Sequence, residues 1–425
     1  MADELAMHFR SASSSAAHGR HERPVARAVW TPIPIVPVDV ETLDVLDVGD
    51  FAPGQRLWLE VSKRGQIIGI IEAFADSGGL SRSYVQELTS DLAKVDIPPY
   101  DSIMDELLPA ASVVVPTVCR SSTQLDATIE SLLALDYPDF EIIVVDNRPD
   151  SRKGRLTLST TDRRVRVVEE PRRGVAAARN RGIADSTRDI IAFTDDDVAV
   201  DRQWLRSIGA RFVRNPEVDG IGGLVLPIEL KERSQLWFEE FFGGFTQLFS
   251  TEVMSMKLSA KNDGMFPYSP GKFGAGCNMA FRRSALDKNG GFDVLLGTGT
   301  PSRGGEDLAI FMKQVLTGGT LAFEPRAVVR HHHRNSDKAF FKQVFGYGTG
   351  LTAMFTALII QDPRHFVRIL RRIPGAYRIL SKPRDERSPS SAASFPRRTH
   401  VLHLIGMIYG PFAYAGSVAR GISQR

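Results

Sequence analysis

Four apolar runs that each end in polar residues decide the fold class. They are ASVVVP at 111–116, FEIIVVDN at 140–147, RVRVVEE at 164–170 and DIIAFTDDD at 189–197. Helical patterns at 124–135 and 174–184 lie between the first and second runs and between the third and fourth. This alternation is typical of an α/β fold with a mixed, mostly parallel sheet flanked by helices. Ligands of such sheets bind at the carboxyl ends of the strands, so the polar residues that end these runs should converge there.

The residues before and after these runs have different patterns. Extended segments with a hairpin turn at 63–65, followed by a helical pattern, predict a small β-rich N-terminal domain at 24–105. Residues 1–23 lack the apolar core of a secretory signal, and we expect a disordered tail there. The α/β domain is predicted at 110–335, and a helical C-terminal region at 336–425.

The C-terminal region combines basic and apolar residues. Arginines and lysines recur among apolar residues after Pro363, and an 18-residue apolar stretch at 401–418 is interrupted by Gly410 and Pro411. That length is the lower limit for crossing a hydrocarbon layer of ~30 Å. Three interpretations stay open: an interfacial or re-entrant anchor, a soluble helical hairpin, and a membrane-spanning helix.

Composition excludes several classes of protein. With 425 residues, 43% hydrophobic and 24% charged, the chain is globular in composition. A net charge of +3 gives no whole-molecule field for nucleic acid. The two cysteines, Cys119 and Cys277, are too few for a disulfide framework or a thiolate metal site, so we expect a reducing cytosol.

Three consecutive carboxylates, Asp195, Asp196 and Asp197, follow the fourth apolar run. Adjacent like charges repel, and a divalent ion such as Mg²⁺ or Mn²⁺ removes that cost while it bridges phosphate oxygens. The alternative is an Asp-rich turn that caps the next helix.

A second acidic pair, Glu306 and Asp307, follows glycines at the start of an amphipathic helical pattern. One of these carboxylates could act as a general base that takes a proton from an acceptor hydroxyl. The alternative is a simple favourable charge at a helix N-terminus.

Three histidines end a later apolar run, AFEPRAVVRHHHR at 322–334. Strand alternation places His331 and His333 on one face and His332 on the other. Beside acidic ligands these imidazoles favour metal binding, and they suit Mn²⁺. Arginines around 172–181 flank a Gly-led helix of small residues and could meet a diphosphate, or they could form a solvated face.

Taken in order, these segments resemble the family-2 glycosyltransferases with a GT-A fold, over roughly residues 111–334. The matching motifs are PTVCR, VVDN, GVAAARNRGI, TDDD, GAGCNMAFRR, GFD, GGED and a terminal strand ending in His. The resemblance implies an inverting transfer of a sugar from a nucleotide diphosphate donor to an acceptor hydroxyl on a glycan, a lipid-linked carrier or a small molecule.

The resemblance also implies roles for individual residues. Asp307 would be the general base with Glu306 beside it, and Asp197, His331 and His333 would hold Mn²⁺ or Mg²⁺. The residues implied for the nucleotide-sugar site are Pro116, Thr117, Arg120, Asp146, Gly174, Arg179, Asp195, Asp196 and Asn278.

Two departures from the family pattern limit what the resemblance implies. No QxxRW-like motif and no bundle of membrane spans follow the α/β region, which argues against a processive polysaccharide synthase. The N-terminal domain lies outside the resemblance. The rival hypotheses are a nucleotidyltransferase and a catalytically silent nucleotide-sugar or glycan-binding protein. We expect a cytoplasmic location, with the C-terminal region as the candidate contact with the inner face of the cell membrane.

Overall fold

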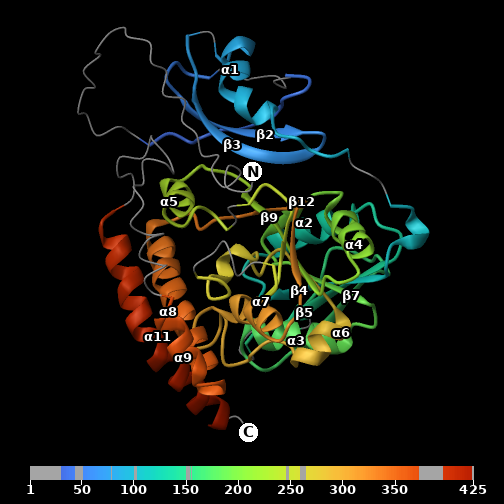
Figure 1. The fold of residues 1–425 in the computed structure, drawn as a ribbon, viewed down its shortest axis with the longest axis vertical. Coiled ribbons are helices and arrows are strands. Elements are labelled where there is room, and N and C mark those ends of the chain that lie inside the picture. The colour runs from blue at the N-terminus through green and yellow to red at the C-terminus, as the bar shows by residue number, and fades with distance from the viewer. Residues whose placement is uncertain are drawn as a thin grey trace.

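The computed structural model describes residues 30–43, 51–77, 79–99, 103–149, 154, 156–245, 248–258, 265–372 and 396–423. The expected tail at 1–23 lies outside these residues. The first elements are β1 (Ile35–Asp39), β2 (Arg56–Lys63), β3 (Gln66–Phe74), α1 (Arg82–Ala93) and the 3₁₀ turn η1 (Asp105–Leu107). The three strands form one sheet, and α1 packs against β2 and β3; these elements are drawn in blue in Figure 1.

The central region contains a nine-stranded sheet. Its first half comprises β4 (Ala111–Thr117), α2 (Ser122–Leu133), β5 (Phe140–Asp146), β6 (Val165–Glu169), α3 (Val175–Asp185), β7 (Ile190–Phe193), β8 (Val198–Val200) and α4 (Trp204–Arg214). Its second half comprises β9 (Gly220–Pro227), α5 (Arg233–Phe242), β10 (Glu252–Met254), η3 (Pro270–Lys272), β11 (Met279–Arg282), α6 (Arg283–Asn289), α7 (Glu306–Leu316) and β12 (Leu321–His331). The helices α8 (Asp337–Gln361), α9 (Arg364–Leu370) and α11 (Arg398–Ser423) follow.

The strand order is β10-β12-β9-β11-β7-β4-β5-β6, with β8 paired to β12. All four runs predicted as strands are present, and their pairs β7–β4, β4–β5 and β5–β6 are parallel. The later half of the sheet contains the antiparallel pairs, because β11 is antiparallel to both of its neighbours. The predicted mixed α/β sheet flanked by helices is confirmed.

Both faces of this sheet are covered, which explains why its strands are apolar throughout. Val113 and Val115 of β4 pack in the core formed with α2 and α4. Val114, one residue between them, packs on the opposite face with α3 and α7. Because successive side chains of a strand point to opposite faces, a strand buried twice shows a continuous apolar run.

The N-terminal sheet packs against the central region. Its hairpin turns at Arg64 and Gly65, both with positive φ, which confirms the turn predicted at 63–65. Trp58 of β2 joins the core of the central region. Arg330 of β12 donates to the Glu60 carboxylate of β2, with Nη1 at 2.6 Å from Oε2. The predicted domain boundaries stay a prediction.

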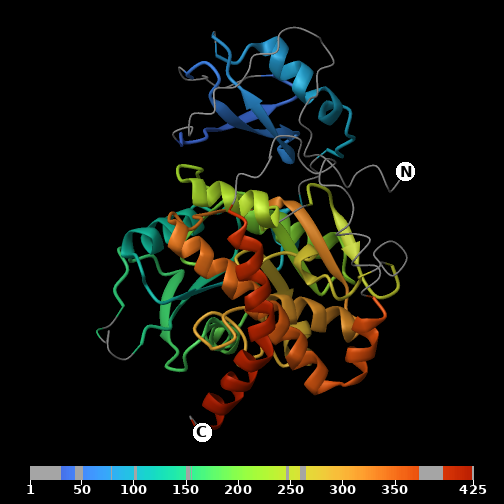
Figure 2. The same ribbon diagram turned by 90° about the vertical axis from the view of Figure 1, so that its left-hand side faces the viewer.

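The helices α8 and α11 pack closely through glycines. A Cβ on Gly406 of α11 would lie 2.3 Å from the Phe345 carbonyl oxygen, and one on Gly348 of α8 would lie 2.2 Å from that of His403. Small residues therefore permit the close approach of the two helices, as in membrane helix pairs. Figure 2 shows α11 running over the outer side of α8.

The stretch at 401–418 is one continuous helix, so the interruption expected at Gly410 and Pro411 does not occur. Proline cannot donate to the carbonyl four residues earlier. Here the Met407 carbonyl, which loses that donor, accepts a hydrogen bond from Thr352 Oγ1 of α8 at 2.6 Å. A neighbouring helix thus satisfies the group that Pro411 leaves open.

Candidate functional site

The strand register brings the acidic motif beside the histidine strand. Residues 195–197 link β7 to β8, and β8 pairs with β12 so that Val198 lies opposite His331. As a result His331 Nε2 lies 3.2 Å from Asp197 Oδ1. Arg334, which sequence reasoning missed, adds a cation at 3.5 Å from Asp197 Oδ2.

Asp197 and His331 each stabilise the charged form of the other. Burial by itself favours the neutral carboxyl, but the charge and hydrogen bond of His331 and the nearby Arg334 hold the pKa of Asp197 well below its usual range. Burial likewise opposes protonation of His331, yet the Asp197 carboxylate raises the pKa of that imidazole above its ordinary value. These contacts favour the ionised form of Asp197, which is the form that binds a cation.

Asp196 has a different environment. Burial, with the charges of Asp197 and Asp195 acting in the same direction, raises the pKa of Asp196 to about 6 although Thr117 donates a hydrogen bond to it. The Thr117 hydroxyl in turn accepts from the backbone N–H of Cys119 at 2.7 Å. This places the end of β4 directly against the acidic motif, as predicted.

Arg179 of α3 connects the remaining parts of the site. Its side chain is only 2% exposed. Nη1 donates to Glu306 Oε1 at 2.8 Å, while Nη2 donates to Asp195 Oδ1 at 3.2 Å and to the Gly276 carbonyl at 3.1 Å. A Cβ on Gly276 would lie 2.7 Å from Nη2 and 3.1 Å from Asp307 Oδ2, so a larger residue there would have to displace these side chains. The buried Arg179 guanidinium is thus occupied by contacts within the protein and links α3, α7, the end of β7 and the Gly276 loop.

The acidic pair at the start of α7 divides into a buried and an accessible carboxylate. Burial and the neighbouring Asp307 charge raise the pKa of Glu306 to about 7, against the opposing effect of Arg179. Asp307 is partly exposed. Its Oδ2 accepts from the Gly276 N–H at 2.9 Å and its Oδ1 from the Leu308 N–H at 2.8 Å.

The structure places several other predicted residues in structural contacts. Asn278 is fully buried, and its amide bonds to Trp204 Nε1 and to the carbonyls of Leu224 and Ala327. These contacts leave the Asn278 side chain occupied inside the sheet. Asn278 directly precedes β11, and from there its side chain reaches the backbone carbonyls of β9 and β12.

His333 lies on the same side as His331, as strand alternation predicts, with the ring centroids 5.9 Å apart. Its Nε2 is engaged by Glu239 of α5 in a buried pair. Because burial disfavours the charged form, the pKa of His333 is lowered. The position therefore gives His333 a carboxylate partner of its own, away from the acidic motif.

The remaining predicted residues line the ends of the first strands. Pro116 and Asp146 are buried at the ends of β4 and β5, and both carboxylate oxygens of Asp146 accept hydrogen bonds from the Arg148 guanidinium. Gly174 precedes α3 with a φ of 124°, a conformation that suits glycine. Arg120 is exposed just beyond β4. Thr117 lies directly opposite Asp146 in the register.

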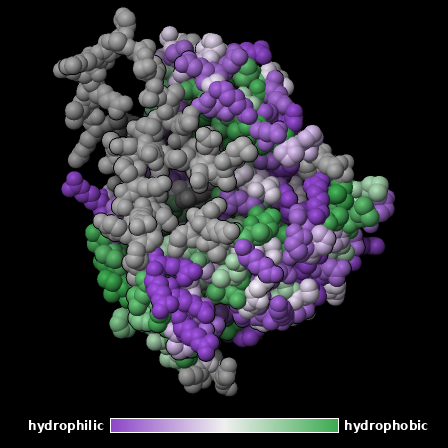
Figure 3. Space-filling model, viewed as in Figure 1, coloured by the Kyte–Doolittle hydropathy of each residue, from purple (hydrophilic) through white to green (hydrophobic). Residues whose placement is uncertain are grey.

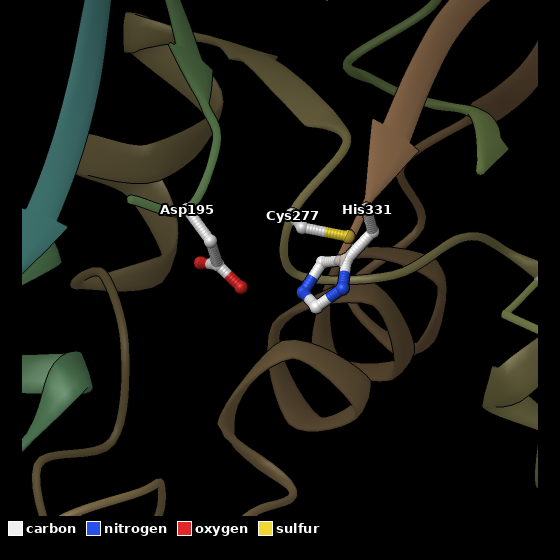
Figure 4. Close-up of side chains that lie close together, drawn as sticks. All are labelled: Asp195, Cys277 and His331. Atoms are coloured by element: carbon white, nitrogen blue, oxygen red, sulfur yellow. The ribbon is translucent and has the colours of Figure 1, made fainter. Parts of the chain in front are cut away.

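Among the described residues, Asp195, Cys277 and His331 form a group whose potential ligand atoms all lie within 4.8 Å of one another. Figure 4 shows the three side chains pointing toward a shared space. Burial raises the pKa of the Cys277 thiol well above its ordinary value. Sequence reasoning missed Cys277 because a single cysteine carries no spacing pattern.

The fold and site together define a mixed α/β domain with an acidic, metal-competent site at the carboxyl end of its parallel strands. Residues 112–290 match the family model described as glycosyl transferase family 2. Residues 112–290, from β4 to the end of α6, are therefore similar to the family 2 glycosyltransferases.

Named relatives agree with that family. A pre-mycofactocin glycosyltransferase of Mycobacterium tuberculosis is 28% identical over 185 residues, which are 43% of this chain and 36% of that protein. A glucosyl-dolichyl phosphate glucuronosyltransferase of Haloferax volcanii is 23% identical over 175 residues, 40% of this chain and 51% of that protein. The chain thus spans about a third to a half of the length of these relatives.

A solved structure of mannosyltransferase PcManGT from Pyrobaculum calidifontis, in complex with GDP-Man and Mn²⁺, aligns with 76% of this chain and 90% of that chain. The identity is 19% and the TM-score 0.41.

Replacing Arg179 by Met should destabilise the protein by about 3–5 kcal/mol, because Glu306 would lose its cation while staying buried. Urea unfolding measures this. Arg181→Met is the matched control, since Arg181 pairs with Asp185 at the surface and should cost less than about 1 kcal/mol. The double variant Arg179→Met/Glu306→Gln should recover part of the loss. Equal stability of Arg179→Met and Arg181→Met would contradict the conclusion that the buried Arg179 holds these parts of the site together.

Proposed function

We propose that this protein transfers a sugar from a nucleoside diphosphate donor to an acceptor hydroxyl, with inversion, by a single metal-dependent displacement. The observation that carries the proposal is the joining of two acidic sites by one loop. The Gly276 carbonyl accepts a hydrogen bond from Arg179, whose guanidinium also binds Asp195. The backbone N–H of Gly276 donates to Asp307. A donor site and an acceptor-activating carboxylate are thereby fixed relative to each other, as a single displacement requires.

The residues of the acidic motif suit a divalent cation. Asp197 and Asp195 offer carboxylate oxygens and His331 offers an imidazole, a donor set that fits Mn²⁺ and, through the oxygens, Mg²⁺. His331 Nδ1 is buried and has no hydrogen-bond partner among the described residues, so the protein alone does not satisfy this imidazole. When bound, the ion neutralises charge on the departing nucleoside diphosphate. We assign Asp197 and His331 as its main ligands and keep His333 as a supporting residue, because its ring centroid lies 5.9 Å from that of His331.

The nucleotide-sugar site is proposed at the ends of β4, β5 and β7. Pro116, Thr117 and Asp146 would form the wall beside the nucleoside, and the exposed Arg120 would meet negative charge. Asp195, Asp196 and Gly174 complete the set. Arg179 and Asn278 would stabilise the residues of this site without contacting the ligand, because their polar atoms are already hydrogen-bonded within the protein.

Asp307 is proposed as the general base. It is the accessible member of the pair, and two backbone N–H groups fix its orientation. Glu306, buried against Arg179, would position the site without touching the acceptor. The carboxylate of Asp307 would take the acceptor proton as the new glycosidic bond forms.

The C-terminal helices are proposed to bring the protein to an anionic membrane surface. On α11 the large apolar residues face outward and the small ones face α8. Exposed on one side are Val401, Leu404, Ile405, Ile408 and Phe412, while Gly406, Gly410, Ala413 and Ser417 are buried. Figure 3 shows apolar side chains gathered along this edge of the molecule. A soluble helix normally has the reverse arrangement.

Exposed basic residues occur on the C-terminal helices as well. Arg364, Arg368 and Arg371 of the α9 segment are exposed next to Phe366, Val367 and Leu370, and Arg397 and Arg398 lie at the start of α11. Cations around an apolar patch match an anionic lipid surface, which attracts basic residues and accepts apolar ones.

The packing of α8 and α11 favours contact with the membrane surface over a span. Both α8 and α11 are long and apolar enough to cross a membrane, and 44% and 28% of their apolar windows are buried in the protein. Because α8 packs against the central region and α11 against α8, we propose a peripheral contact at the inner face of the cell membrane. A lipid-linked acceptor would fit this location, and the Haloferax relative bears the name of a transferase for a dolichyl phosphate.

Asp307→Asn should lower turnover by roughly 10²-fold or more while donor affinity changes only a few-fold, because the amide keeps the side-chain shape but cannot take a proton. Product formation from a panel of nucleotide sugars, with the affinity for the nucleoside diphosphate measured by calorimetry, checks both parts. Glu306→Gln is the matched control. Near-normal turnover of Asp307→Asn together with an inactive Glu306→Gln would assign the base to the other carboxylate.

The double variant Ile408→Gln/Phe412→Gln should bind anionic vesicles at least about tenfold more weakly, since each side chain is worth ~1.5–3 kcal/mol when buried. Co-sedimentation with phosphatidylglycerol vesicles at low salt measures this. Phe74→Gln/Leu107→Gln removes two exposed apolar residues that lie on β3 and η1, outside the C-terminal helices, and should bind like the wild type. If the wild-type protein stays in the supernatant, or self-associates through this face, the membrane contact is refuted.

A further inference from the structure

The thiol of Cys277 lies where hard oxygen ligands for a cation are expected. Its Sγ, a carboxylate oxygen of Asp195 and a ring nitrogen of His331 come from three separate segments: the loop before β11, the end of β7 and the end of β12. All three atoms lie within 4.8 Å of one another. Figure 4 shows the sulfur and the imidazole on one side of this space and the carboxylate on the other.

The position of Cys277 is fixed by its backbone. The Cys277 carbonyl accepts from Thr194 Oγ1 at 2.8 Å. The residue before it, Gly276, is held by Arg179 and Asp307, and the residue after it, Asn278, donates its N–H to the Ala275 carbonyl at 2.9 Å. The thiol is therefore presented by a rigid turn that the donor-side and acceptor-side residues share.

Each of the three groups offers one atom that can bind a divalent ion, namely a carboxylate oxygen, a ring nitrogen and a sulfur. The His331 ring is buried, and its Nδ1 has no hydrogen-bond partner among the described residues. Histidine, cysteine and aspartate together form a donor set that Zn²⁺ and Co²⁺ accept readily, and that Mg²⁺, which prefers oxygen, does not. The donor chemistry thus differs from that of an all-oxygen site.

We propose that Cys277 and Asp195 join Asp197 and His331 as ligands of the donor-site cation, and that the sulfur favours a thiophilic ion, of the Zn²⁺ or Co²⁺ class, over Mg²⁺. The inference rests on the proposed function in that the same site holds the cation of the transfer reaction. On binding, the S–H bond breaks, its proton leaves to solvent, and the sulfur lone pair forms the bond to the ion, with no change in oxidation state.

Cobalt provides a readout that does not depend on activity. Co²⁺ bound to a thiolate has a sulfur-to-metal charge-transfer band in the near ultraviolet, which a site of oxygen and nitrogen ligands lacks. Titration of the full chain with Co²⁺ should produce this band. Cys277→Ser should abolish this band and weaken Co²⁺ binding by at least about tenfold. Removal of a residue that only supports a metal ligand already costs about that much affinity, so loss of a ligand should cost at least as much.

Cys119→Ser is the matched control, because Cys119 is the other free cysteine and follows the end of β4. This variant should keep the band and the Co²⁺ affinity. The Mg²⁺ affinity of Cys277→Ser should stay within about threefold of the wild type, since a serine oxygen suits the hard ion at least as well as sulfur does.

The outcomes separate this inference from the proposed function. Co²⁺ binding by calorimetry without a charge-transfer band in the wild type would overturn the role of Cys277 and leave the metal-dependent transferase intact. A band that survives in Cys277→Ser but not in Cys119→Ser would also overturn it. Failure to bind any divalent ion, with or without nucleoside diphosphate, would overturn the metal dependence itself.

Discussion

The rest of the site depends on one buried cation, the Arg179 guanidinium. It lies between Asp195 at the end of β7 and Glu306 at the start of α7, and it holds the Gly276 loop through a carbonyl. Without this charge, the buried Glu306 carboxylate would lose its cation partner, at a cost of several kcal/mol. The guanidinium can make these contacts because its donors form a fixed fork.

The fold was largely predictable because the parallel strands are buried on both faces. Such strands read as continuous apolar runs, and β4 to β7 appear where those runs stand. The antiparallel half was not predictable in the same way, since short strands such as β8 and β10 carry no distinct periodicity. The continuity of α11 through Pro411 depends on Thr352, a residue of another helix that no local pattern can supply.

The candidate site was predictable in its residue types but not in its pairings. Asp197 and His331 were expected together, and the β8–β12 register brings them within hydrogen-bonding distance. Asn278 and Arg179 were expected to meet ligand, yet both are bonded inside the protein, because burial and partners are properties of the tertiary structure. Cys277 gave no signal, since only the fold places it beside Asp195.

The most direct measurement is calorimetric binding of nucleoside diphosphates with and without Mn²⁺, for the wild type and Asp197→Ala. Removing this carboxylate from a site with few protein ligands should weaken the Mn²⁺-dependent part of binding at least about tenfold. Asp201→Ala, a neighbouring acid beyond β8, should bind like the wild type. Unchanged Mn²⁺-dependent affinity in Asp197→Ala would contradict a metal-linked donor site at this end of the sheet.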